Sequence, residues 1–106
     1  MAIKKGRGSN KANGLCKFAI DEEMTIYTIE YIKQEISKEL DLYERFEINL
    51  SALEEIDSAG VQLLLALRKE MIGRRKSLKI TALNSMVSTV LENYGISNLF
   101  SEGDLV

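Results

Sequence analysis

Asp57 and Ser58 carry the side chains whose types and position point most clearly to chemistry. They stand between an alternating, strand-like segment at 46–50 and an apolar segment at 61–67 that is typical of a helix. A hydroxyl in the first turn of a helix has two interpretations. It can cap free backbone N–H groups, or those N–H groups and the positive end of the helix dipole can receive a phosphate attached to it. The residues alone favour the cap, because serine caps are common.

The amino-acid inventory excludes most enzyme chemistry. The 106 residues contain no His and a single Cys, which rules out His-based nucleophile triads, imidazole bases and Cys- or His-rich zinc sites. Cys16 lies in an apolar stretch and is predicted to fill a core position. The chain also lacks a P-loop and a dinucleotide-binding glycine motif. We therefore expect no cofactor, no metal site and no enzymatic activity.

Charge is distributed unevenly along the chain. Residues 1–17 hold five basic and no acidic residues, whereas the remainder holds nine basic and 16 acidic residues, so a +5 segment precedes a −7 body. The basic segment has no interleaved aromatic residues, and we expect no nucleic-acid binding. We divide the chain into a basic segment, 1–14, with a possible short edge strand at 2–4, and a single domain, 15–106.

Nothing in the sequence predicts membrane insertion. A run of about 18 apolar residues is missing, and the basic N-terminus is not followed by the apolar core of a signal peptide. We expect a cytoplasmic protein.

Hydrophobic periodicity predicts three repeats of a strand followed by a helix. Apolar residues alternate with polar ones at 16–20, 46–50 and 78–82. The first helix begins after Thr28 and ends near residue 41 or 42. The second is capped by Asp57 or Ser58 and runs to about residue 75. The third begins at 84 or 85, places Val87, Val90, Leu91 and Tyr94 on one face, and stops at Gly95, before a short closing element at 96–100.

Strand–helix alternation predicts a single α/β domain with a mainly parallel sheet and right-handed crossovers. Strands covered on both faces read as continuous apolar runs, whereas these strands place a polar residue at nearly every second position. We therefore expect the helices to pack on one face of the sheet only. With the edge strand included, the sheet has about four to five strands.

Several short motifs match a known family. They are Glu23-Met24-Thr25, Asn49-Leu50, Ile56-Asp57-Ser58-Ala59-Gly60-Val61, Leu78-Lys79-Ile80 and Asn84-Ser85. On these motifs the region 15–100 resembles the STAS family, the domain of bacterial anti-sigma factor antagonists and of the cytoplasmic ends of sulfate transporters. The Asp57–Gly60 loop is the most specific element. The chain departs from the family where Glu22 replaces a common Gly and Thr25 a common Asp.

The resemblance implies a regulator switched by another protein. Ser58 is similar to the serine phosphorylated by a partner kinase, an anti-sigma factor of the histidine-kinase-like ATPase fold. In the unmodified state the protein would bind this partner and displace a sigma factor, and phosphorylation would end the binding. The candidate partner-binding residues are Asp57, Ser58, Ala59, Gly60, Thr25, Tyr27 and Leu63.

Four of these candidates also have a structural interpretation. Asp57 can be a helix cap, and Gly60 can relieve crowding between helix and strand. Tyr27 can pack ahead of the Thr28 cap instead of anchoring a partner. Leu63, like Leu67, can be partly buried under the next helix instead of forming a partner groove or a self-association patch.

Two further functions compete with partner switching. One is an unphosphorylated STAS scaffold, as in a lipid-transport ABC complex or a chemotaxis-associated protein. The other is a small-molecule enzyme, which only scattered carboxylates and lysines could serve. The sequence leaves the oligomeric state open between a monomer and a weak dimer.

Overall fold

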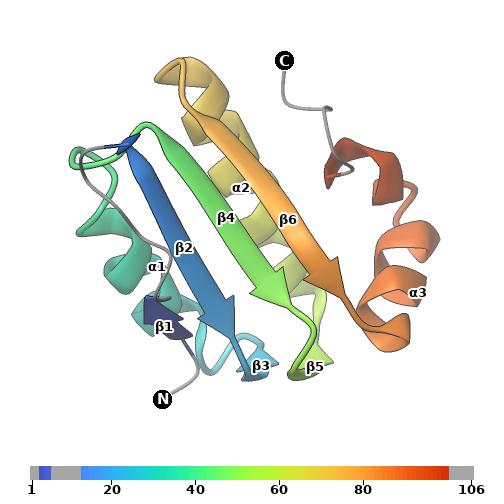
Figure 1. The fold of residues 1–106 in the computed structure, drawn as a ribbon. Helices are drawn as coiled ribbons and strands as arrows, with labels where there is room; N and C mark the ends of the chain where they lie inside the picture. The colour runs from blue at the N-terminus through green and yellow to red at the C-terminus, as the bar shows by residue number, and fades with distance from the viewer. Residues whose placement is uncertain (1–2, 6–12, 101–106) are drawn as a thin grey trace.

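A four-stranded sheet forms the centre of the molecule (Figure 1). The computed structural model describes residues 3–5 and 13–100. The strands lie in the order β1-β2-β4-β6, with β1 antiparallel to β2 and the other pairs parallel. Their bounds are Ile3–Lys5, Leu15–Ile20, Arg45–Leu50 and Ser77–Leu83 for β1, β2, β4 and β6. The predicted mainly parallel sheet is confirmed. The rest of the predicted basic segment, residues 1–2 and 6–12, lies outside the described residues.

The helices follow the strands in the predicted order. They are α1 (Ile29–Ser37), α2 (Ser58–Gly73), α3 (Ser85–Asn93) and the short 3-10 helix η2 (Ser97–Phe100). Figure 1 shows α1 and α2 behind the sheet and α3 beyond β6, so the front face carries no helix. The apolar side chains that alternate along the strands, including Cys16, Phe46 and Ile48, are buried on the covered face. The expected one-sided packing is confirmed.

A second, two-stranded sheet was not predicted. β3 (Glu22–Met24) pairs in parallel with β5 (Leu53–Ile56), and the register shifts between Glu22 and Glu23. Glu22 has a φ of 59°, in the left-handed region that favours glycine. Strands of three and four residues interrupted by a bulge are too short for a period of two to be visible. This small sheet places the loop before α1 beside the loop before α2.

Two predicted helix ends differ from the structure. α1 ends at Ser37 instead of residue 41 or 42, because the next turns tighten: the Glu39 amide donates to the Ile36 carbonyl at 3.0 Å, three residues back. α2 ends at Gly73 instead of residue 75, and Arg75 takes a left-handed φ of 60°. Gly95 stops α3 with a φ of 72° as predicted, but Tyr94 is exposed and does not lie on the buried face.

Gly60 lies where α2 packs against the small sheet. A Cβ atom at this position would lie 2.2 Å from the Met24 carbonyl oxygen and 2.8 Å from Cγ1 of Ile56. No real Cβ atom tolerates such a distance, so α2 can begin against β3 and β5 only if residue 60 has no side chain. The expectation that Gly60 relieves crowding is confirmed, although the crowding comes mainly from β3.

We expect Gly60→Ala to lower the free energy of unfolding by about 3 kcal/mol, because backbone must move to admit the methyl group. Urea denaturation measures this change. Gly73→Ala is the matched control: nothing lies within 4 Å of a Cβ at Gly73, and we expect it to raise the free energy of unfolding by about 0.5 kcal/mol. Equal stability of Gly60→Ala and the unmodified protein would contradict the close contact.

Candidate functional site

The loop 25–28 and the segment 57–60, which is the cap and first turn of α2, lie side by side at the carboxyl end of the sheets, and we call them the paired loops. Met24 and Ile56 are register partners at the ends of β3 and β5, so the chain leaves both strands at the same point. The Asp57 amide then donates to the Met24 carbonyl at 3.2 Å. The carboxyl end of a parallel sheet is the usual place for binding sites in open α/β folds.

Asp57 ties the paired loops together. Its Oδ1 accepts the Gly60 amide at 3.1 Å and thereby caps α2, while its Oδ2 accepts the Ile26 amide at 3.0 Å. The pKa of the Asp57 carboxyl is lowered from its ordinary value of 3.8, chiefly by the Ile26 amide, with partial desolvation opposing this. Of the two predicted caps, Asp57 is the one that the structure uses.

Ser58 is the first residue of α2 and is exposed. Its hydroxyl makes no hydrogen bond to another residue of the described part of the chain, because Asp57 already supplies the cap. The hydroxyl therefore stands in solvent at the positive end of a 16-residue helix. The amino terminus of a helix is a favourable position for an anionic group.

Thr25, one of the predicted partner-binding residues, stabilises the loop from inside and does not form its surface. Its side chain is only 2% exposed, and its hydroxyl donates to Glu23 Oε2 at 2.5 Å. Thr28 stands at the predicted cap position of α1, but its hydroxyl makes no cap bond to the helix. It accepts the Thr25 amide and donates to the Glu23 carbonyl, both at 3.0 Å. These bonds fix the loop backbone in one conformation.

Tyr27 and Ile26 project from this supported loop into solvent. Tyr27 is 89% exposed and Ile26 63% exposed. The interpretation in which Tyr27 packs ahead of the Thr28 cap is wrong, because a packed ring would not be exposed to this degree. Sequence reasoning missed Ile26, although a large apolar residue in a predicted loop was a usable signal.

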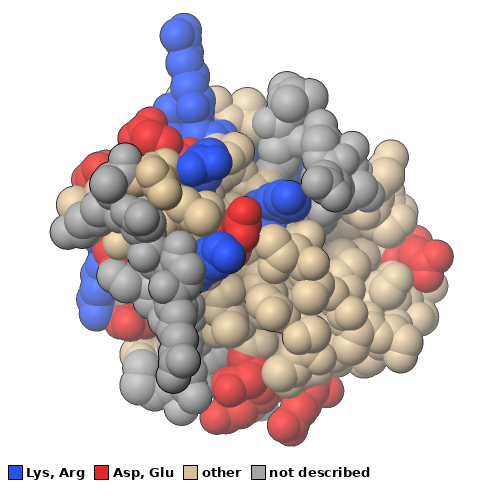
Figure 2. Space-filling view, in the orientation of Figure 1, with Lys and Arg blue, Asp and Glu red and all other residues tan. Residues whose placement is uncertain are grey.

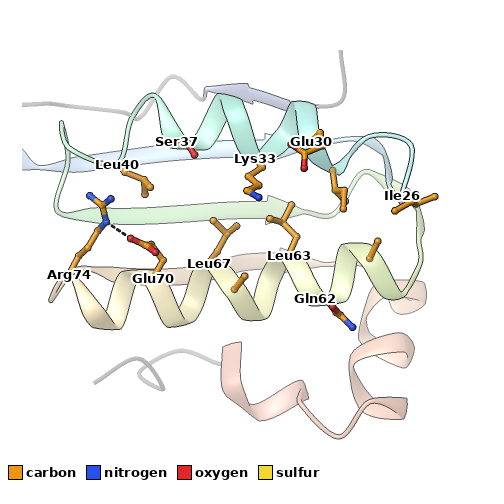
Figure 3. A pocket seen from close by; sticks show the side chains of 13 residues that line it. Ile26, Glu30, Lys33, Ser37, Leu40, Gln62, Leu63, Leu67, Glu70 and Arg74 are labelled. Carbon is orange, nitrogen blue, oxygen red and sulfur yellow. Dashed lines mark hydrogen bonds and ion pairs between the residues drawn. The ribbon is translucent and has the colours of Figure 1, made fainter.

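A groove of about 580 Å³ runs between α1 and α2, starting at the paired loops (Figure 3). Ile26 and Ala59 line its beginning, and Leu63 and Leu67 line the α2 side farther along. Lys33 points across the groove from α1. Leu63 is only 7% exposed, so it contributes mainly to the core and offers the groove little surface. Sequence reasoning named Leu63 as a candidate for a partner groove but could not place the groove, since the spacing of two helices has no local sequence signal.

The paired loops stand in an acidic environment. The segments 18–32 and 46–67, which contain both loops and the strands before them, hold eight acidic residues and no Lys or Arg. Figure 2 shows acidic side chains along the lower edge, where Figure 1 places the ends of β3 and β5. Glu54, Glu55 and Glu30 are exposed. A negative group added here would meet other negative charges and no neighbouring cation from these segments.

Metal-ligand clusters and membrane spans are both missing from the part of the chain that the structure describes. No group of three or more His, Cys, Asp and Glu side chains in residues 3–5 and 13–100 is arranged to hold a metal ion. Over the same ranges, no helix is both long and apolar enough to cross a bilayer.

The two hydrogen bonds that the Asp57 carboxylate accepts from backbone amides predict a pH dependence of stability. Because folding lowers the pKa of this carboxyl, its contribution is complete above the unfolded pKa and is lost as the pH falls through the folded pKa. Thermal melts between about pH 6 and pH 2 should show a steeper loss of Tm for the unmodified protein than for Asp57→Asn. Glu54→Gln removes the same charge from an exposed neighbour and should keep the steep profile. Parallel profiles for all three proteins would refute the role of Asp57.

Comparison with known proteins places this geometry in a family. The family model described as "Mlab, STAS domain" matches residues 11–105. No curated protein matches the chain at the level of sequence.

Solved structures share the fold at low sequence identity. The anti-sigma factor antagonist SpoIIAA in its unphosphorylated form is 18% identical with a TM-score of 0.76, over 92% of this chain and 84% of that chain. An anti-sigma factor antagonist from Mycobacterium paratuberculosis is 20% identical with a TM-score of 0.77, over 92% and 82%. The Bacillus cell fate determinant SpoIIAA in its phosphorylated form is 17% identical with a TM-score of 0.72, over 94% and 88%. The protein has the fold of the anti-sigma factor antagonists, and the chain belongs to the STAS domain family.

Proposed function

We propose that this protein is a partner-switching regulator of the anti-sigma factor antagonist type, whose paired loops bind a kinase of the histidine-kinase-like ATPase fold. The observation that carries the proposal is the exposed Ser58 hydroxyl at the start of α2, left free because Asp57 makes the cap. The two SpoIIAA structures, one unphosphorylated and one phosphorylated, support a switch of this kind in a protein of the same fold. The partner supplies the chemistry, and this chain is its substrate.

The binding surface combines exposed apolar side chains with a rigid backbone. Ile26 and Tyr27 offer the apolar contact, next to Ala59 at the mouth of the groove. Asp57, Thr25 and Gly60 hold the loops in place, so binding costs little ordering of the chain. Tyr27 has the exposure and residue type of an interface anchor.

Phosphorylation of Ser58 acts on the interface and leaves the fold intact. A phosphoserine adds about −1.5 to −2 charges at neutral pH. The amino terminus of α2 stabilises that charge in the free protein. In a complex, the same charge must be desolvated beside Asp57 and near Glu54 and Glu55. The segments 18–32 and 46–67 provide no Lys or Arg side chain to pair with it. Phosphorylation therefore destabilises the complex with the partner more than it destabilises the fold.

We expect the partner kinase and ATP to phosphorylate Ser58, and mass spectrometry locates the phosphate. We also expect Ser58→Asp to weaken binding to the partner kinase at least tenfold, which corresponds to about 1.4 kcal/mol. Titration calorimetry measures the binding. The matched control is Ser85→Asp, because Ser85 is likewise the exposed first residue of a helix whose preceding residue, Asn84, makes the cap. Ser85→Asp should bind as the unmodified protein does.

Two outcomes of this experiment would contradict the proposal. If Ser58 acquires no phosphate and Ser58→Asp binds normally, the switch does not exist. If Ser58→Asp and Ser85→Asp weaken binding equally, the effect is one of net charge and not of position. Melting curves of both variants check that the fold survives.

Tyr27→Ala tests the contact itself. We expect it to weaken partner binding by about 2 kcal/mol, roughly 30-fold, while the Tm stays within a few degrees, because the ring touches solvent and not the core. Leu42→Ala is the control, since Leu42 is an exposed apolar residue at the opposite end of the sheet, before β4. Normal binding by Tyr27→Ala would exclude Tyr27 as an anchor.

A second candidate function is an unphosphorylated scaffold subunit of a lipid-transport ABC complex. The family model described as "Mlab, STAS domain" supports a STAS domain without specifying a phosphorylation switch, so it is compatible with a scaffold as well. Co-purification with a transporter ATPase, together with normal binding of that ATPase by Ser58→Asp, would support the scaffold against the switch. Both proposals assign one domain at 15–106 and a cytoplasmic location.

A further inference from the structure

A second surface, remote from α1, is almost free of charge. Residues 80–99, which form most of β6, all of α3 and the start of η2, contain one charged residue, Glu92, whereas 28% of the whole chain is charged. Figure 2 shows a broad area of uncharged side chains where Figure 1 places the lower half of β6 and α3. We call the exposed and half-buried side chains of residues 80–99 the charge-poor surface. Depletion of charge distinguishes the core of protein interfaces from other surfaces.

Apolar side chains are incompletely covered on the same surface. Six hydrophobic residues in the described chain are only partly buried against the core, and four of them lie here: Met86, Val90, Ile96 and Leu99. Leu83 is 40% exposed and Tyr94 is 51% exposed. β6 is also the last strand of the sheet, with no strand of the described residues on its outer side. The apolar side chains near this edge are therefore less completely buried than those at the centre of the sheet.

We infer that the charge-poor surface binds a second copy of this chain. In a twofold interface the same patch meets itself, so a charge near the axis would meet its own copy and repel it. The charge-poor surface satisfies this condition, because Glu92 is its single charge. The acidic paired loops do not satisfy it, since the segments 18–32 and 46–67 around them hold eight acidic residues and no basic residue. Contact between two charge-poor surfaces also covers the half-buried apolar residues of both copies.

The predicted dimer leaves α1 and the loop before it available. α1 lies behind the β2 side of the sheet, whereas α3 lies beyond β6 (Figure 1). A dimer through the outer face of α3 leaves α1 and the exposed Ile26 and Tyr27 uncovered, and the inference does not depend on what binds to them.

Sedimentation of the purified full chain tests the inference. We expect the average mass to rise with concentration from 11.9 kDa towards twice that value, with little change between roughly 0.05 and 0.5 M NaCl, because few charges take part. The double variant Leu83→Glu/Tyr94→Glu should stay monomeric, and so should Leu83→Lys/Tyr94→Lys. An equimolar mixture of the two should dimerise again, because every contact between these positions then joins opposite charges.

The control is Ile26→Glu/Tyr27→Glu, which adds the same charges at exposed apolar residues of the paired loops and should dimerise normally. An unmodified protein that stays at 11.9 kDa at all concentrations overturns the inference without any variant. A mixture of Glu and Lys variants that stays monomeric overturns it too, as does a loss of the dimer in the Ile26→Glu/Tyr27→Glu control.

Discussion

The approach of α2 to the Met24 carbonyl governs the geometry of the whole site. Gly60 has no side chain, so α2 can begin directly against the end of β3. The same approach brings the Asp57 amide to the Met24 carbonyl and the Asp57 carboxylate to the Ile26 amide. A larger residue at position 60 would separate the two loops and break these bonds together. One missing methyl group therefore determines both the packing of the helix and the position of the loops.

This constraint explains the division of labour within the paired loops. The side chains of Thr25 and Asp57 and the missing side chain of Gly60 are used by the fold, whereas the side chains of Ile26, Tyr27 and Ser58 are exposed. A reactive hydroxyl is useful to another protein only if its own chain leaves it free. Because the carboxylate next to Ser58 makes the cap, the serine does not have to.

Much of the fold could be predicted from the sequence, because β2, β4 and β6 each bury one face and show it as alternation. β3 and β5 could not, since they are short and owe their pairing to the tertiary register of Met24 and Ile56. Asp57 and Ser58 both carry a side-chain oxygen suited to capping, so only the structure could choose between them. The spacing of α1 and α2, and hence the groove, depends on packing over the whole sheet.

The register of the parallel sheet has a consequence for how the chain is made. Cys16 pairs with Phe46 and Phe46 with Leu78, so each parallel contact joins residues about thirty positions apart. Such contacts form slowly, because a long loop must close before any of them forms. During synthesis β4 has no neighbour on one side until β6 leaves the ribosome, and the apolar face of α2 stays partly uncovered for the same period. The last third of the chain therefore completes the sheet and protects it from aggregation.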